Sequence, residues 1–204
     1  ANLRFLGTAL YLREPEEERF FFRVSGESSG NFANSDNAYL LNATSLATDE
    51  IILLRWKAPK VSRSFGDFSV NDVRYFSISL SNDSSFNYIT YPDQDLYVAS
   101  DGYINLVIAR EDDEVVSRAE GLNYMVWDKR LGERAYILYR NMLTNDSFAN
   151  GIRECPTIAG NYAAFLADSE SYDAKNYMQE YAPSGRVMSK QAFLEDFGGI
   201  EVSY

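Results

Sequence analysis

The sequence predicts a mainly β protein in which antiparallel strands form one sandwich or barrel. Aromatic residues make up 15% of the 204 residues, with 15 Tyr and 13 Phe, and such residues are enriched in strands. Residues 71–81 (NDVRYFSISLS) alternate between two faces, with Phe76, Ile78 and Leu80 on one of them. This period of two is typical of a strand that buries one face.

The length predicts a single domain over residues 1–204, because a chain of this size can bury a sizeable core. Residues 14–142 are expected to form the sheets. Residues 1–13 (ANLRFLGTALYLR) are an apolar segment, a strand or short helix that its own domain or a neighbouring subunit should cover. Residues 143–204 are expected to be a helical or irregular tail packed on the sheet.

The strands are predicted from alternation or from short apolar runs bounded by turn residues. Residues 49–58 (DEIILLRWKA) are apolar on both faces, which predicts a central strand. Pro59 ends it because proline has no amide donor. The segments expected to be strands are residues 19–24, 38–41, 49–58, 71–81, 96–98, 104–108, 134–142 and 200–204.

One hairpin is predicted between residues 96–98 and 104–108. The turn would be Ser100-Asp101-Gly102, where glycine tolerates the positive φ that a tight turn needs. This hairpin would leave Asp101 exposed at its tip.

The C-terminal tail carries helical spacing in residues 145–153 and 171–181. Pro183-Ser184-Gly185 is expected to break the second of these segments, and Ser189 is a plausible N-cap for a helix over residues 190–197. Gly198-Gly199 would end that last helix. The apolar face that docks on the sheet would hold Ala174, Tyr177, Met178 and Tyr181.

The net charge of −11, from 19 Lys and Arg against 30 Asp and Glu, argues against nucleic acid or an anionic membrane as a partner. No window approaches the roughly 18 consecutive apolar residues of a membrane-spanning helix. The start at Ala1 is typical of a chain after signal-peptide cleavage, so we expect a secreted, extracellular protein. The single Cys155 predicts no internal disulfide.

Histidine is absent, which removes the Ser-His-Asp and Cys-His machineries and His-ligated metal sites. An enzyme would have to work through carboxylates, Tyr, Lys or Arg. We therefore expect a protein without catalytic activity, with no obligatory cofactor.

The acidic residues near the predicted hairpin could hold Ca²⁺, because Asp93, Asp95 and Asp101 flank it and residues 111–114 (EDDE) follow its second strand. The alternative is that Asp101 is a turn residue and residues 111–114 form a solvated loop. No EF-hand spacing is present.

The aromatic residues Tyr103, Tyr124 and Trp127 could line a face that binds a sugar or another small ligand by stacking. The alternative is that they are core residues or cross-strand pairs. Strand arginines amid apolar neighbours should pair with carboxylates rather than bind an anion; they are Arg55, Arg74, Arg134 and Arg140.

Several strand and turn segments together suggest a family; they are Tyr39-Leu40 and residues 49–60 (DEIILLRWKAPK), 73–83 (VRYFSISLSND), 93–109, 121–152 and 178–193, with Gly198-Gly199. These segments resemble a set of secreted bacterial and fungal proteins of unknown function, and the central part is more distantly similar to the C-terminal β domain of DUF1254/DUF1214 proteins. The resemblance implies a jelly-roll type of sandwich and export, but no activity. The chain departs from the family at Ser79, where Cys is frequent, and at Phe76 and Tyr124, where Trp is frequent.

Three functions remain open. The first is a secreted structural protein that self-assembles into an oligomer or filament through its apolar terminal segments. The second is a β-sandwich module that binds a glycan or small ligand, and the third is a carboxylate-based hydrolase. The sequence favours the first over the second, and both over the third.

Overall fold

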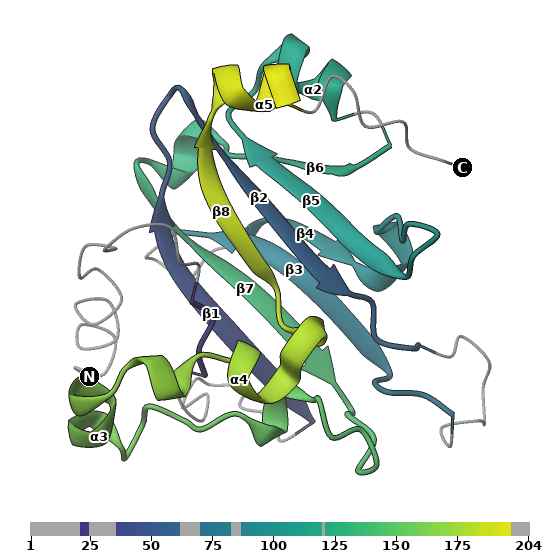
Figure 1. The fold of residues 1–204 in the computed structure, drawn as a ribbon, viewed down its shortest axis with the longest axis vertical. Helices are drawn as coiled ribbons and strands as arrows, with labels where there is room; N and C mark the ends of the chain where they lie inside the picture. Colours follow the sequence, from purple (N-terminus) through teal and green to yellow (C-terminus); the bar gives the residue numbers. More distant parts are fainter. Residues whose placement is uncertain (1–20, 25–35, 62–69, 83–86, 120, 197–204) are drawn as a thin grey trace.

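The computed structural model describes residues 21–24, 36–61, 70–82, 87–119 and 121–196, which form a mainly β structure of two sheets (Figure 1). The predictions for residues 1–13 and 200–204 and for Gly198-Gly199 lie outside these residues. The described strands are β1 (Asn37–Ser45), β2 (Glu50–Lys57), β3 (Tyr75–Ser81), β4 (Asn87–Pro92), β5 (Tyr103–Ala109), β6 (Asn123–Val126), β7 (Arg134–Met142) and β8 (Ser184–Ser189).

The two four-stranded sheets have the orders β1-β7-β3-β4 and β6-β5-β2-β8, and they pack as a sandwich. Their inner faces form the main core, in which the Trp56 ring of β2 meets the Tyr139 ring of β7 edge-on at 5.9 Å between centroids. The Tyr91 hydroxyl of β4 donates to the Tyr124 carbonyl of β6 at 2.7 Å, a second link between the sheets. The predicted β-sandwich class is confirmed.

Strand β3 follows the predicted alternation, but both of its faces are buried. Ile78 is fully buried on the inner face, and Ser77 and Ser79 on the other face are only 2% and 6% exposed. These short side chains lie in register with the larger Arg140 and Leu138 of β7, which shield them from solvent. The expectation of a half-buried strand is therefore wrong for the serine face.

Strands β5 and β6 pair in parallel, whereas the other pairs are antiparallel. A parallel pair needs a crossover, which α2 (Asp113–Arg118) provides. The Asp112 side chain caps this helix by accepting the Glu114 and Val115 amides. The solvated loop expected at residues 111–114 is thus a helix start. The eight described strands match the count of a jelly roll, but the parallel pair is foreign to that topology.

The predicted hairpin at residues 96–108 is wrong, although its turn exists. Gly102 has the expected positive φ of 83°, and its amide donates to the Ala99 carbonyl at 2.9 Å. Residues 96–98 form no strand, because β5 already pairs with β2 and β6 on its two edges. The Asn123 side chain instead bonds both the amide and the carbonyl of Tyr97, at 2.8 and 2.9 Å. The strands that do pair as a hairpin are β3 and β4, which precede this segment in the chain.

The C-terminal tail contains a strand that the sequence did not predict. Ser184 and Gly185, expected to break the chain, begin β8, which pairs with β2. Glycine is required there because a Cβ at Gly185 would lie 2.1 Å from the Leu53 carbonyl oxygen. The helix expected after Ser189 is confirmed as α5 (Lys190–Asp196), and the Ala192 amide donates to the Ser189 hydroxyl at 3.1 Å.

The remaining helical segments are short. The face expected in residues 171–181 does pack on the core, with Ala174 and Met178 fully buried, but the segment is broken into turns. In the described residues no helix is long and apolar enough to cross a membrane. These segments are η1 (Asp93–Asp95), η2 (Lys129–Leu131), η3 (Ile152–Glu154), α3 (Tyr162–Ala167), η4 (Glu170–Tyr172), α4 (Lys175–Met178) and η5 (Gln179–Tyr181).

Candidate functional site

Among the described residues, helices cover only one half of the outer face of the β6-β5-β2-β8 sheet. Helices α2 and α5 lie at the same end of this sheet (Figure 1) and bury Val115 and Phe193 against Ile51 and Val107. At the opposite end, α4 and η5 lie beside the start of β8. The uncovered half between them carries the polar outward residues of β2, β5 and β8.

This uncovered half contains an open hollow of about 640 Å³, which we call the sheet hollow. A smaller hollow of about 460 Å³ shares Arg55, Lys175 and Ser184 with it. Both volumes lie in the range of about 300 to 1,000 Å³ typical of small-molecule sites. The sheet hollow is lined by Leu53, Leu54 and Arg55 of β2, Tyr97, Ala99, Ser100 and Asp101, Asn105, Leu106 and Val107 of β5, Gly121, Leu122, Lys175 of α4, and Ser184, Gly185 and Arg186 of β8.

Arg55 lines both hollows and is held by three neighbouring side chains. Its guanidinium donates to Asn105 Oδ1 at 2.7 Å and to Asp101 Oδ2 at 2.8 Å, and it stacks 4.1 Å from the Tyr103 ring centroid. Asp101 also accepts the Tyr103 amide, and the Arg55 bond lowers the pKa of its carboxyl. The predicted ion pair of Arg55 is confirmed, yet 48% of its side chain remains exposed.

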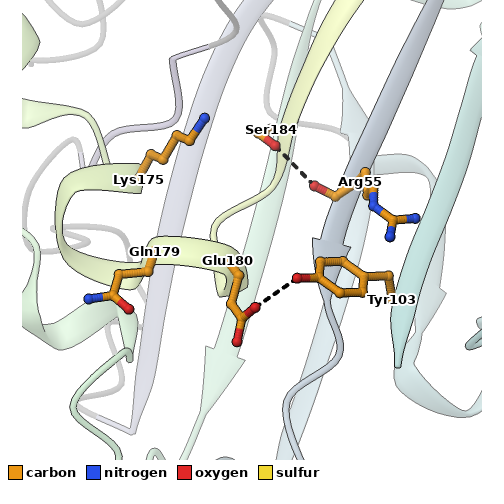
Figure 2. Close-up of a pocket in the computed structure, with 6 residues that line it drawn as sticks. All are labelled: Arg55, Tyr103, Lys175, Gln179, Glu180 and Ser184. Carbon is orange, nitrogen blue, oxygen red and sulfur yellow. Dashed lines mark hydrogen bonds between the residues drawn. The ribbon is translucent and has the colours of Figure 1, made fainter. Parts of the chain in front are cut away.

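Tyr103, Glu180 and Lys57 form a second network, of which Tyr103 and Glu180 line the smaller hollow (Figure 2). The Tyr103 hydroxyl donates to Glu180 Oε2 at 2.7 Å, and the Lys57 ammonium donates to the other carboxylate oxygen. The bond from Lys57, followed by that from Tyr103, lowers the pKa of Glu180, and the Glu180 bond raises the pKa of Tyr103. The network ties η5 to β2 and β5 and keeps Glu180 ionised.

Two further cations line the sheet hollow, and neither has a partner in the described part of the chain. Lys175 projects from α4 (Figure 2), and Arg186 is an outward residue of β8; both are exposed. With Arg55 they make three cations against the single carboxylate of Asp101. The hollow is thus locally positive in a protein whose net charge is −11. Such a surface attracts anions.

The structure does not bring the predicted ligand-binding residues together. Tyr103 contributes to the smaller hollow. Tyr124 packs beside α2, and its hydroxyl donates to the Arg110 carbonyl at 3.0 Å. Trp127 is 1% exposed, and its indole nitrogen donates to the Gly132 carbonyl at 2.9 Å, as the core alternative expects.

The predicted calcium ligands are divided between two segments. Asp93 and Asp95 lie in η1, whereas Asp101 is held by Arg55 in the turn before β5. Among the residues that the structure describes, no three carboxylate or thiol side chains gather closely enough to hold a metal ion. Calcium binding stays a prediction.

Sequence reasoning missed Lys175, Glu180 and Arg186. Arg186 belongs to β8, which was not predicted because the Pro183-Ser184-Gly185 run indicates a break in the chain. The available signal was the alternation after Pro183, where Ser184 and Arg186 point to one face and Gly185 and Val187 to the other.

No family model matches this chain, and no curated protein matches it. It is similar in fold to an uncharacterised protein from Burkholderia cenocepacia, with a TM-score of 0.50 and 13% identity over 84% of this chain. The VPA0106 protein from Vibrio parahaemolyticus matches with a TM-score of 0.38 and 10% identity over 95% of this chain. The chain spans 36% of the length of each of these solved chains. The first likeness shows the fold alone, and the DUF1254/DUF1214 resemblance stays a prediction.

Proposed function

We propose that this chain is a binding module for a small anionic ligand, which the sheet hollow holds. The observation that carries the proposal is that Lys175 and Arg186 line the hollow without a partner among the described residues, next to the half-exposed Arg55. A guanidinium carries more N–H donors than the pair that Asp101 and Asn105 occupy, so Arg55 can donate to a ligand as well.

The geometry favours binding because Arg55 is already fixed in place. A ligand that pairs with a preorganised guanidinium loses less free energy to ordering the side chain than one that must immobilise a free arginine. Asn105 and Asp101 accept hydrogen bonds from the two terminal nitrogens of the guanidinium, and the Tyr103 ring stacks against its face.

The titratable groups beside Arg55 support binding over acid–base catalysis. General acids and bases work best with pKa values near the operating pH. Here the pKa values of Asp101 and Glu180 are lowered and that of Tyr103 is raised, so each is moved away from neutrality. Asp101 and Glu180 instead fix the cations Arg55 and Lys57 in place.

The test is calorimetric titration of the chain with citrate and with inorganic phosphate at low ionic strength. The double variant Lys175→Gln with Arg186→Gln should weaken binding of the better anion by about tenfold or more, since two charge-assisted contacts are lost. Arg118→Gln is the matched control, because Arg118 is an exposed cation at the end of α2, outside the hollow. The proposal fails if the double variant binds like the Arg118 control.

A further inference from the structure

We infer that the anionic ligand of the sheet hollow is an acidic saccharide, one whose sugar rings carry carboxylates. This inference rests on the proposed function and names the class of ligand. Three features of the hollow carry it: an exposed tyrosine, an apolar floor between polar groups, and an anion site made only of side chains.

The exposed tyrosine is Tyr97, which lines the hollow and is 43% exposed. Its backbone is fixed by the Asn123 side chain, which accepts its amide and donates to its carbonyl. A tyrosine with an anchored backbone and an exposed ring is an apolar platform with a polar tip. The C–H face of a pyranose ring is apolar and stacks on such a platform.

The rest of the lining alternates apolar and neutral polar groups. Leu53 of β2 and Leu122 form a partly exposed apolar floor, and Asn105 and Ser184 are neutral polar residues of the same lining. A saccharide presents hydroxyls around an apolar ring face, so it needs this mixture of hydrogen-bonding groups and apolar surface. A compact inorganic anion would use the cations and leave Tyr97 and the apolar floor uncovered.

The backbone also argues against a site built for phosphate. Phosphates are commonly held by free backbone amides at helix N-termini or in turn-like nests. Strand β2, at the centre of the hollow, is paired on both edges by β5 and β8, so its amides are engaged in the sheet. The charges that remain for an anion belong to Arg55, Lys175 and Arg186, which come from β2, α4 and β8, and cations on three separate elements suit carboxylates carried on separate rings.

The experiment compares trigalacturonate with a neutral galactose trisaccharide, citrate and inorganic phosphate by calorimetry. We expect trigalacturonate to bind about tenfold or more tightly than the neutral trisaccharide, because the neutral sugar lacks the charge-assisted contacts. Tyr97→Ala should weaken trigalacturonate by roughly tenfold through the lost stacking surface and leave citrate unchanged. Tyr97→Phe keeps the ring and should retain binding.

Tyr162→Ala is the matched control, since Tyr162 is also 43% exposed but lies on α3, away from the hollow. If citrate or phosphate binds as tightly as trigalacturonate and Tyr97→Ala has no effect, the saccharide is wrong while the anion site stands. If no anion binds, or if the neutral trisaccharide binds equally well and the Lys175 and Arg186 variants change nothing, the proposed function fails as well.

Discussion

The amide of Asn141 is fully buried on the inner face of β7, and neither its oxygen nor its nitrogen has a hydrogen-bond partner in the described residues. Its neighbours in register, Ala38 and Phe76, are apolar. A buried amide without partners destabilises a fold, because the water bonds it loses are not replaced. Asn141→Leu should therefore raise the free energy of unfolding by about 1 kcal/mol in urea denaturation.

The control for this prediction is Asn42→Leu, also on an inner face. The Asn42 side-chain nitrogen donates to the Phe21 carbonyl at 2.9 Å, although its oxygen has no partner in the described residues, so its replacement leaves a partly buried acceptor unpaired. We expect Asn42→Leu to lower the free energy of unfolding by about 1 to 2 kcal/mol. A similar loss for Asn141→Leu would contradict the prediction and mean that its amide is satisfied in solution.

For Arg55, the sequence predicts pairing with a carboxylate but does not identify which carboxylate. A charged side chain amid apolar neighbours must be paired whatever the fold. The partner depends on the β2–β5 register, which places Asn105 directly opposite Arg55 and Asp101 at the turn before β5. That register comes from the packing of the whole sheet.

Among the helices, α5 and the start of α2 are joined by an ion pair of Lys190 in addition to their apolar packing. The Lys190 ammonium lies 2.6 Å from an Asp112 carboxylate oxygen and 3.5 Å from Glu114, and the Lys190 bond lowers the pKa of Asp112. A carboxyl whose folded pKa is depressed contributes stability above its unfolded value of 3.8 and loses it as pH falls through the folded value. Asp112→Asn keeps a capping side chain and removes the charge.

We expect Asp112→Asn to lower the urea midpoint equally at about pH 7 and pH 5, and by less at about pH 3, because below 3.8 the unfolded chain binds the proton first and the stability from the depressed pKa begins to be lost. The Asp113→Asn variant, which alters an exposed neighbour in the same turn, is the control for the general loss of one negative charge. An Asp112→Asn effect of the same size at all three pH values would show that the Lys190 pair does not stabilise the contact between α2 and α5.

The elements divide into those that local patterns predict and those that they do not. β2, β3 and β7 are long apolar or alternating runs, so their patterns alone identify them. β8 begins in a Ser-Gly pair after a proline, and its strand conformation comes from pairing with β2 along the edge left open opposite β5. Helix α2 begins in an acidic run that resembles a solvated loop, and Val115 alone within it is buried.

For the molecule as a whole the net charge is negative, whereas the charge within the sheet hollow is positive. The net charge of −11 predicts repulsion of polyanions, and this holds at distances where the charges act together. Within the sheet hollow, three cations outnumber one carboxylate, and contacts at a few ångströms are screened much less than distant ones. Composition alone could not reveal the hollow, because its cations come from three separate segments of the chain.

The sequence favours self-assembly through residues 1–13, which lie outside the described part of the chain. The described lining of the sheet hollow comes from β2, β5, β8, α4 and the segments at 97–101 and 121–122. Removal of residues 1–13 should therefore affect self-assembly and leave anion binding intact. If the apolar segment drives assembly, light scattering of the chain should give a particle heavier than the single-chain mass of 23.2 kDa, and removal of residues 1–13 should reduce it to that mass. Anion binding should survive the deletion with a Kd within about twofold, since the described lining of the hollow includes none of residues 1–13. A chelator that dissociates the particle would support the calcium prediction, whereas a full-length chain of 23.2 kDa, indifferent to chelator, would rule out assembly and leave the binding module.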